Sequence, residues 1–96
     1  MKLKIIAKSD RDIFVGVDAD GDYSVVSLDD TKEIELRDVL SAKAWNDREG
    51  EWKTVKNLTK KESVRICLES WGCSRASAFD LLRRLNNPAK ILTLKD

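Results

Sequence analysis

One stretch decides the fold of this chain: residues 58–88, which read LTKKESVRICLESWGCSRASAFDLLRRLNNP. Its first half carries the spacing i, i+3, i+4, i+7 of a buried helix face, at Val64, Cys67, Leu68 and Trp71. Thr59 stands before that pattern and Glu62 follows Thr59 by three residues, which is the arrangement of a helix capping box. The stretch therefore predicts a helix over 59–71.

The second half of the stretch predicts a second helix, separated from the first by a tight turn. Gly72 stands where a residue in the left-handed conformation ends a helix, and Ser74 is suited to cap the next one. The apolar stripe of this second helix is made by Ala78, Leu81, Leu82 and Leu85. Pro88 stops it, because proline disfavours a helical conformation in the residue before it. We expect a helical pair over residues 59–87.

The residues before this pair are patterned as short strands. β-Rich or alternating segments cover 2–7, 12–18, 22–29, 32–42 and, as a hairpin, 44–55. Asp20-Gly21 predicts a tight turn between the second and third of these strands, because such turns need residues that tolerate a positive φ. After the helical pair, the segment 90–94 predicts a strand that returns to the sheet.

Together these patterns predict an α+β fold in a single domain of residues 1–96. A small antiparallel sheet, or an SH3-like or OB-like barrel, is expected over 1–58, followed by the two-helix module and a closing strand within 88–96. Trp71 lies in the stripe of the first helix and is expected in the core. Trp45 and Trp52 flank the polar turn of the 44–55 hairpin and are expected to pack across it.

Composition narrows the classes of function. The chain has 42% apolar and 36% charged residues and a net charge of +1, which is typical of a globular protein. No apolar run approaches the roughly 20 residues of a membrane helix, and the N-terminus lacks a signal-peptide pattern, so we expect a cytoplasmic protein. With no His and only two Cys, the chain lacks a His-based catalytic triad and a zinc ligand set. We expect no enzymatic activity and no cofactor.

Charge is divided unevenly along the chain. Residues 1–59 hold 10 Lys and Arg against 13 Asp and Glu, a net charge of −3. Residues 60–96 hold 8 against 4, a net charge of +4, and the two halves sum to the +1 of the whole chain. The basic half contains the expected helical pair, which hints at an anionic partner there.

Residues 72–85, GCSRASAFDLLRRL, resemble the turn and second helix of a helix-turn-helix DNA-binding module. The matching positions are the turn, the cap, the helix packing point and the apolar stripe, at Gly72, Ser74, Ala78, Leu81 and Leu82. The resemblance covers residues 63–85 and implies that the second helix enters the major groove of duplex DNA. It implies a small DNA-binding or transcription-regulating protein, with a homodimer or a partner protein needed for tight binding.

The same resemblance implies which residues contact DNA. The start of the second helix would meet base edges and phosphates through Ser74, Arg75 and Ser77. The surrounding basic side chains would hold the phosphate backbone, and these are Lys60, Lys61, Arg65, Arg83 and Arg84. Clustering of these residues on one exposed positive face would favour DNA as the partner.

Other interpretations remain open at this point. The helical pair is compatible with a plain αα-hairpin, and the protein is then an adaptor or inhibitor that binds another protein. An exposed apolar patch near Trp45 or Trp52 would favour such a partner. A third interpretation is single-stranded nucleic acid binding on the barrel. The run DADGDYSVVSLD spaces its carboxylates like a calcium loop, but Tyr23 stands where that loop needs Gly, so we expect an acidic hairpin tip without metal.

Overall fold

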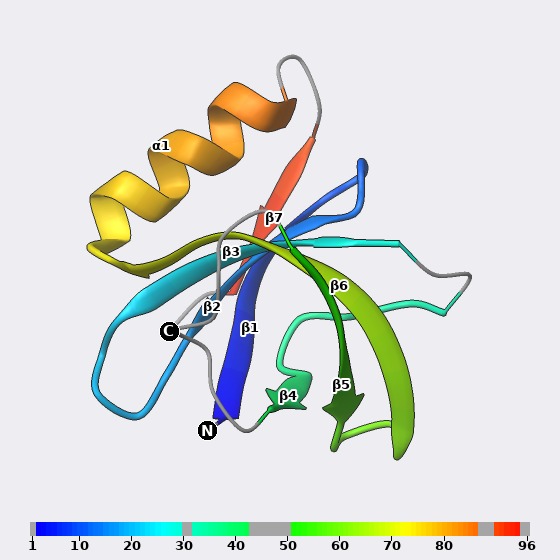
Figure 1. The fold of residues 1–96 in the computed structure, drawn as a ribbon. Helices are drawn as coiled ribbons and strands as arrows, with labels where there is room; N and C mark the ends of the chain where they lie inside the picture. The colour runs from blue at the N-terminus through cyan, green and yellow to red at the C-terminus, as the bar shows by residue number, and fades with distance from the viewer. Residues whose placement is uncertain (1, 30–31, 43–50, 87–89, 95–96) are drawn as a thin grey trace.

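The chain folds into a closed β-barrel with one helix packed on its outside (Figure 1). This computed structural model describes residues 2–29, 32–42, 51–86 and 90–94. Its elements in chain order are β1 (Lys2–Ser9), β2 (Ile13–Val17), β3 (Tyr23–Leu28), β4 (Val39–Ser41), β5 (Trp52–Asn57), β6 (Glu62–Cys73), α1 (Arg75–Asn86) and β7 (Ile91–Thr93). Within those ranges, no helix has the length and the apolar character that crossing a bilayer demands.

The barrel closes because β1 has partners on both of its edges. The strands run in the order β1-β2-β3-β6-β5-β4, and β4 pairs back to β1. β7 extends the pairing of β1 at its far end, where Ala7 lies opposite Thr93. The β1–β2 register shifts between Ile5 and Ala7, which marks a bulge. A bulge bends and twists a strand, and this bend suits β1 to pairing with three neighbours.

The first core fills the inside of the barrel. Alternation along the strands sends every second side chain inward, as at Val64, Ile66 and Leu68 of β6. The remaining buried members of this cluster are Leu3, Ile5, Phe14, Val26, Ile34, Leu40 and Val55. Gly16 leaves room for one of them, because a Cβ there would lie 2.4 Å from Cγ of Leu3. β1 and β2 therefore approach closely where the barrel closes.

A second core lies between the barrel and α1. The helix, which lies outside the barrel in Figure 1, contacts β2, β3 and β6. Its buried residues Ala78 and Leu82 pack on the outward-facing Val15 and Val25. Leu85, the last residue of the predicted stripe, is 40% exposed. The helix ends at Asn86, as Asn-Asn-Pro predicts. One barrel wall is thus buried on both faces, and α1 is held there by a narrow apolar stripe.

The helix predicted over 59–71 is wrong, because these residues form the β5–β6 turn and most of β6. Val64, Ile66 and Leu68 follow the two-residue alternation of a strand, while Val64 and Leu68 also belong to the 3.6-residue pattern of a helix. The β-branched side chains of Val64 and Ile66 favour a strand. β6 pairs with β3 on one edge and with β5 on the other, so its backbone N–H and C=O groups find hydrogen-bond partners within the sheet. The long-range pairing, which the local pattern does not show, decides the outcome.

The predicted capping box is instead a hairpin turn. Oδ1 of Asn57 accepts hydrogen bonds from the backbone N–H groups of Thr59 and Lys60, both at 3.2 Å. Lys61 has a φ of 56°, in the left-handed region that such a turn uses. Gly72 has the predicted positive φ, 65°, but it lies near the end of a strand and not at the end of a helix.

The helix-turn-helix resemblance and the α+β class with a helical pair over 59–87 are therefore wrong. Within the described residues the fold is mostly β with one helix. For residues 1–58 the sequence predicted either a small antiparallel sheet or a barrel, and the structure contains a barrel. That barrel takes in β6 as well, which is why it extends beyond residue 58.

Several local predictions are confirmed. β2 and β3 form an antiparallel hairpin in which Val17 lies opposite Tyr23, with Gly21 at the tip and a φ of 83°. β7 lies within the predicted strand 90–94. The predicted strand segment 32–42 contributes only β4, and Arg37 within it has a φ of 76°.

The tryptophans differ from the prediction. Trp71 is 43% exposed, so its expected place in the core is wrong. Trp52 lies on β5 and is 45% exposed. Trp45 and most of the predicted 44–55 hairpin lie outside the described residues.

Candidate functional site

The start of α1 is fixed by a serine cap, as the sequence predicts. The backbone N–H of Ser77 donates to Oγ of Ser74 at 3.1 Å, and the two hydroxyl groups are also 3.1 Å apart. This hydrogen bond satisfies one of the free N–H groups of the first turn. Both serines are exposed, and their hydroxyl groups are already engaged with the cap. The cap sets the direction in which the next residue, Arg75, leaves the barrel.

Arg75 is stacked on two aromatic rings. Its guanidinium carbon lies 4.9 Å from the ring centre of Phe79 and 5.9 Å from that of Tyr23. Both distances are within the range of cation–π attraction. Because Phe79 follows Arg75 by one helical turn and Tyr23 comes from β3, the helix and the barrel hold the guanidinium together. The side chain is exposed and oriented in advance of any ligand.

Arg83 lies on the same side of the helix, about two turns after Arg75 and one turn after Phe79. Arg75, Ala76, Phe79 and Arg83 of α1 and Thr93 of β7 line a shallow hollow of about 560 Å³. Arg83 is exposed and forms no ion pair with any residue that the structure describes. We call Arg75, Phe79 and Arg83, with Tyr23 and Thr93, the Arg75 flank. It presents two cations, one of them stacked, around an open hollow.

Arg84 lies on the other side of α1. Successive helix residues are about 100° apart around the axis, so Arg84, nine residues after Arg75, lies about 180° from Arg75. Its guanidinium forms an ion pair with Asp80 at 2.7 Å, one turn earlier. Both side chains are exposed. Arg84 therefore carries a local ion-pair partner, and Arg83 has none within the part of the chain that the structure describes.

The lysines expected to hold DNA lie at the opposite end of β6 from α1 (Figure 1). Nζ of Lys60 donates to the carbonyl oxygen of Glu33 at 2.9 Å and lies 3.4 Å from Oδ2 of Asp38. Lys60 thus ties the β5–β6 turn to the segment before β4. Lys61 is exposed in the same turn. The predicted DNA-binding residues do not form one continuous face.

Beneath Lys60, a buried polar network closes this end of the barrel. Oδ2 of Asp38 accepts hydrogen bonds from Nδ2 of Asn57 at 2.9 Å and from the backbone N–H of Glu35 at 3.0 Å. The Asp38 and Asn57 side chains are almost completely buried. Buried polar groups are costly without partners, so this network is a structural element of the barrel.

Arg65, the remaining predicted contact, belongs to a separate surface on the outside of β5 and β6. Its guanidinium lies 5.8 Å from the ring centre of the exposed Trp52. Nearby, the buried Cys67 thiol has a raised pKa, because burial and the Glu69 carboxylate disfavour the thiolate, although a hydrogen bond with Ser27 lowers the pKa. Cys67 is therefore held as an inert thiol.

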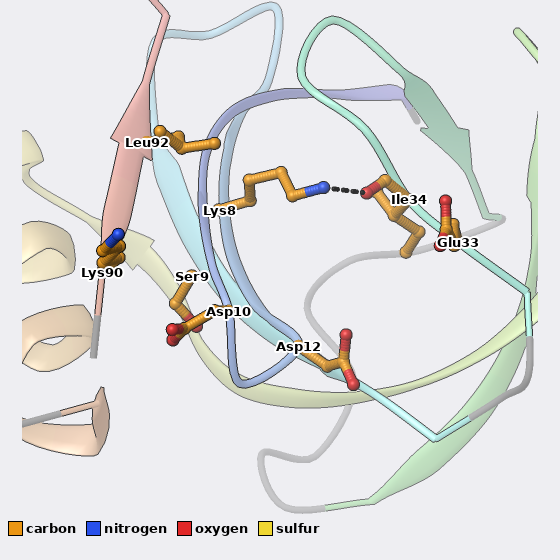
Figure 2. Close-up of a pocket in the computed structure, with 8 residues that line it drawn as sticks. All are labelled: Lys8, Ser9, Asp10, Asp12, Glu33, Ile34, Lys90 and Leu92. Atoms are coloured by element: carbon orange, nitrogen blue, oxygen red, sulfur yellow. Dashed lines mark hydrogen bonds between the residues drawn. The ribbon is translucent and has the colours of Figure 1, made fainter.

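A pocket that the sequence did not indicate lies where the β1–β2 turn meets β7 (Figure 2). Its volume is about 320 Å³, and it is lined by Lys8, Ser9, Asp10, Asp12, Glu33, Ile34, Lys90 and Leu92. Three segments that are distant in sequence form it, which is why no local motif marks it. Residues 8–12, which read KSDRD, form one side of it, but this charged run alone does not indicate a pocket.

Metal ligation finds no support among the described residues, where no group of three or more His, Cys, Asp and Glu side chains is placed to hold an ion. At the acidic hairpin tip, Oδ1 of Asp18 accepts hydrogen bonds from the backbone N–H groups of Asp20 at 2.9 Å and Asp22 at 3.1 Å. This carboxylate orders the turn itself.

The chain matches no protein-family model, and no curated protein or solved structure shows significant similarity to it. Its function is therefore argued from the chemistry of these surfaces.

Proposed function

We propose that the protein is a non-enzymatic nucleic-acid-binding module and that the Arg75 flank is its contact surface. The observation that carries this proposal is the pair of exposed guanidinium groups, Arg75 and Arg83, around one hollow on α1. Guanidinium groups match phosphate oxygens with two parallel hydrogen bonds, and stacking on Phe79 and Tyr23 orients one of them beforehand.

The charge of the chain limits this binding to a few contacts. A protein of net charge +1 gains little from its overall field, so the two arginines have to supply the attraction locally. With two phosphate contacts on duplex DNA, the logarithm of the binding constant should fall with the logarithm of salt concentration with a slope of about −2. Such a surface binds weakly as a monomer, and a dimer would double the number of contacts.

The test is binding of the whole chain to a random duplex and to a random single strand at about 50 mM salt, with oligomeric state measured alongside. Arg75→Ala and Arg83→Ala should each weaken binding and flatten the salt slope by about one unit. Arg84→Ala is the matched control, because it removes the same charge from the opposite side of the same helix. Absence of binding to both probes, or an equal effect of all three variants, would overturn the proposal.

A second candidate function is the binding of a protein partner by the outer surface of β5 and β6. Trp52 is 45% exposed there and is covered on one side by Arg65. Exposed aromatic and arginine side chains are common at the centres of protein interfaces. The two candidates separate in one experiment, because Trp52→Ala should leave nucleic-acid binding unchanged if the Arg75 flank is the site.

A further inference from the structure

The pocket at the β1–β2 turn, here called the Lys8 pocket, is separate from the Arg75 flank and has the size of a small-ligand site. Its volume of about 320 Å³ falls at the lower end of the range of about 300–1,000 Å³ that small-molecule sites occupy. The floor is the buried Ile34, and one wall is Leu92, which is 59% exposed. A ligand in the pocket would cover an apolar side chain that is otherwise open to water.

The ammonium group of Lys8 has unused hydrogen-bonding capacity. It can donate three hydrogen bonds. Among the described residues it donates to the carbonyl oxygen of Ile34 at 3.4 Å, which is long for such a bond. It forms no ion pair with the described residues, although carboxylates line the same pocket. Lys8 is half-buried and points across the hollow (Figure 2). It can therefore receive the acidic group of a ligand.

Of the three carboxylates that line this hollow, those of Asp12 and Glu33 lie on the side toward which Lys8 points (Figure 2). Asp12 has a φ of 59°, a conformation in which few residues other than Gly are found. Its carbonyl oxygen accepts a hydrogen bond from the N–H of Leu28 at 2.8 Å, which anchors this turn to the end of β3. Asp tolerates this left-handed conformation in turns, so the β1–β2 turn places an acidic side chain at the pocket.

The balance of charge selects the class of ligand. The two lysines of the lining, Lys8 and Lys90, stand against three carboxylates, Asp10, Asp12 and Glu33, a net charge of −1. This balance opposes a phosphate or another dianion, and a bare cation would meet the Lys8 ammonium. A molecule that carries both an acidic and a basic group satisfies both sides.

We propose that the Lys8 pocket binds a small zwitterion of the amino-acid class. The carboxylate of the ligand accepts from Lys8, its ammonium group donates to Asp12 and Glu33, and its side chain covers Leu92. An apolar side chain suits this last contact best, because Leu92 is the exposed apolar wall. This site is independent of nucleic-acid binding by α1.

The experiment is a titration of the isotope-labelled protein with leucine, methionine, glycine and inorganic phosphate, each to about 10 mM, followed by amide NMR shifts. Leucine and methionine should shift the amides of residues 8–12, 33–34 and 92 together, and glycine should bind more weakly. Phosphate should leave the amide shifts of these residues unchanged. No shift with any amino acid, or phosphate binding as tight as that of leucine, would overturn the proposal.

Two variants locate the ligand. Lys8→Met and Glu33→Gln should each lower leucine affinity at least about tenfold. Lys4→Met is the matched control, because Lys4 is an exposed lysine on the same strand that does not line the pocket, and it should bind leucine as the parent does. Glu33 is exposed, so Glu33→Gln is expected to fold. This variant therefore tests the ligand site even if Lys8→Met does not fold. Unchanged affinity in Glu33→Gln would contradict the assignment.

Discussion

Replacing Gly16 by Ala is expected to destabilise the barrel, because the new methyl group has no room at the β1–β2 contact. A Cβ at this position would lie 2.4 Å from Cγ of Leu3, 2.7 Å from Cδ2 and 3.0 Å from Cδ1. Cγ is the branch point of a completely buried side chain, so it cannot move without disturbing the core. Gly16 has an ordinary negative φ, so the backbone itself accepts Ala.

The size of the effect follows from two opposing contributions. Forcing a methyl group into a packed core costs about 1–3 kcal/mol. Ala in a strand recovers about 0.5–1 kcal/mol, because it loses less backbone entropy on folding than Gly. The expected net loss in the free energy of unfolding is therefore about 1–2 kcal/mol, which for a domain of this size lowers Tm by roughly 4–16 °C.

A double-mutant cycle separates the clash from other effects. Leu3→Ala alone should cost about 2–5 kcal/mol, because it leaves a cavity inside the barrel. In that background Gly16→Ala fills part of the cavity, so the double variant should be more stable than the sum of the single effects predicts, by about 1–3 kcal/mol. Urea unfolding of the four proteins measures this coupling. A neutral Gly16→Ala, or additive effects, would refute the close approach of β1 and β2.

Three further outcomes are expected. Asp38→Ala should cost about 3 kcal/mol in urea unfolding, since two hydrogen bonds to a buried carboxylate are lost and Nδ2 of Asn57 loses its partner. A loss below about 1 kcal/mol would argue against the network. Gly72→Ala should cost about 1 kcal/mol through its positive φ alone, since its surroundings are open, and Ala without effect on Tm would contradict that geometry. The pKa of the Cys67 thiol is raised by burial first and by Glu69 second, so its contribution to stability is present below the unfolded pKa and is lost as pH rises through the folded value. The free energy of unfolding should fall at alkaline pH, and less so in Cys67→Ala; an identical alkaline slope in the two proteins would refute this linkage.

The parts of the fold that sequence predicted are those governed by neighbours along the chain. The Asp20-Gly21 hairpin depends on two residues that tolerate positive φ, and the start of α1 depends on a serine three residues before the N–H that it caps. Strand β6 pairs with β5, which precedes it through a short turn, and with β3, which lies far away in sequence. The twelve residues of β6 satisfy a helical pattern equally well on their own. Prediction failed where pairing partners, absent from the local window, decide the conformation.

The candidate sites also differ in whether they depend on neighbouring residues or on the tertiary fold. Arg75 and Arg83 were expected to be exposed on one helix, and that helix exists. The stacking of Arg75 on Tyr23 was not foreseen, because it requires β3 to lie beside α1. The Lys8 pocket was missed for the same reason, since its walls come from three segments that only the closed barrel brings together.

The position of β1 also sets the order in which the chain can fold during synthesis. β1 and β2 pair locally and can form as soon as they leave the ribosome, but the other edge of β1 needs β4 and then β7. Because Ala7 pairs with Thr93, part of that edge has no partner until residue 93 has been made. A topology of such high contact order folds slowly. An open strand edge invites pairing with other chains, so the nascent protein is most prone to aggregate just before β7 emerges.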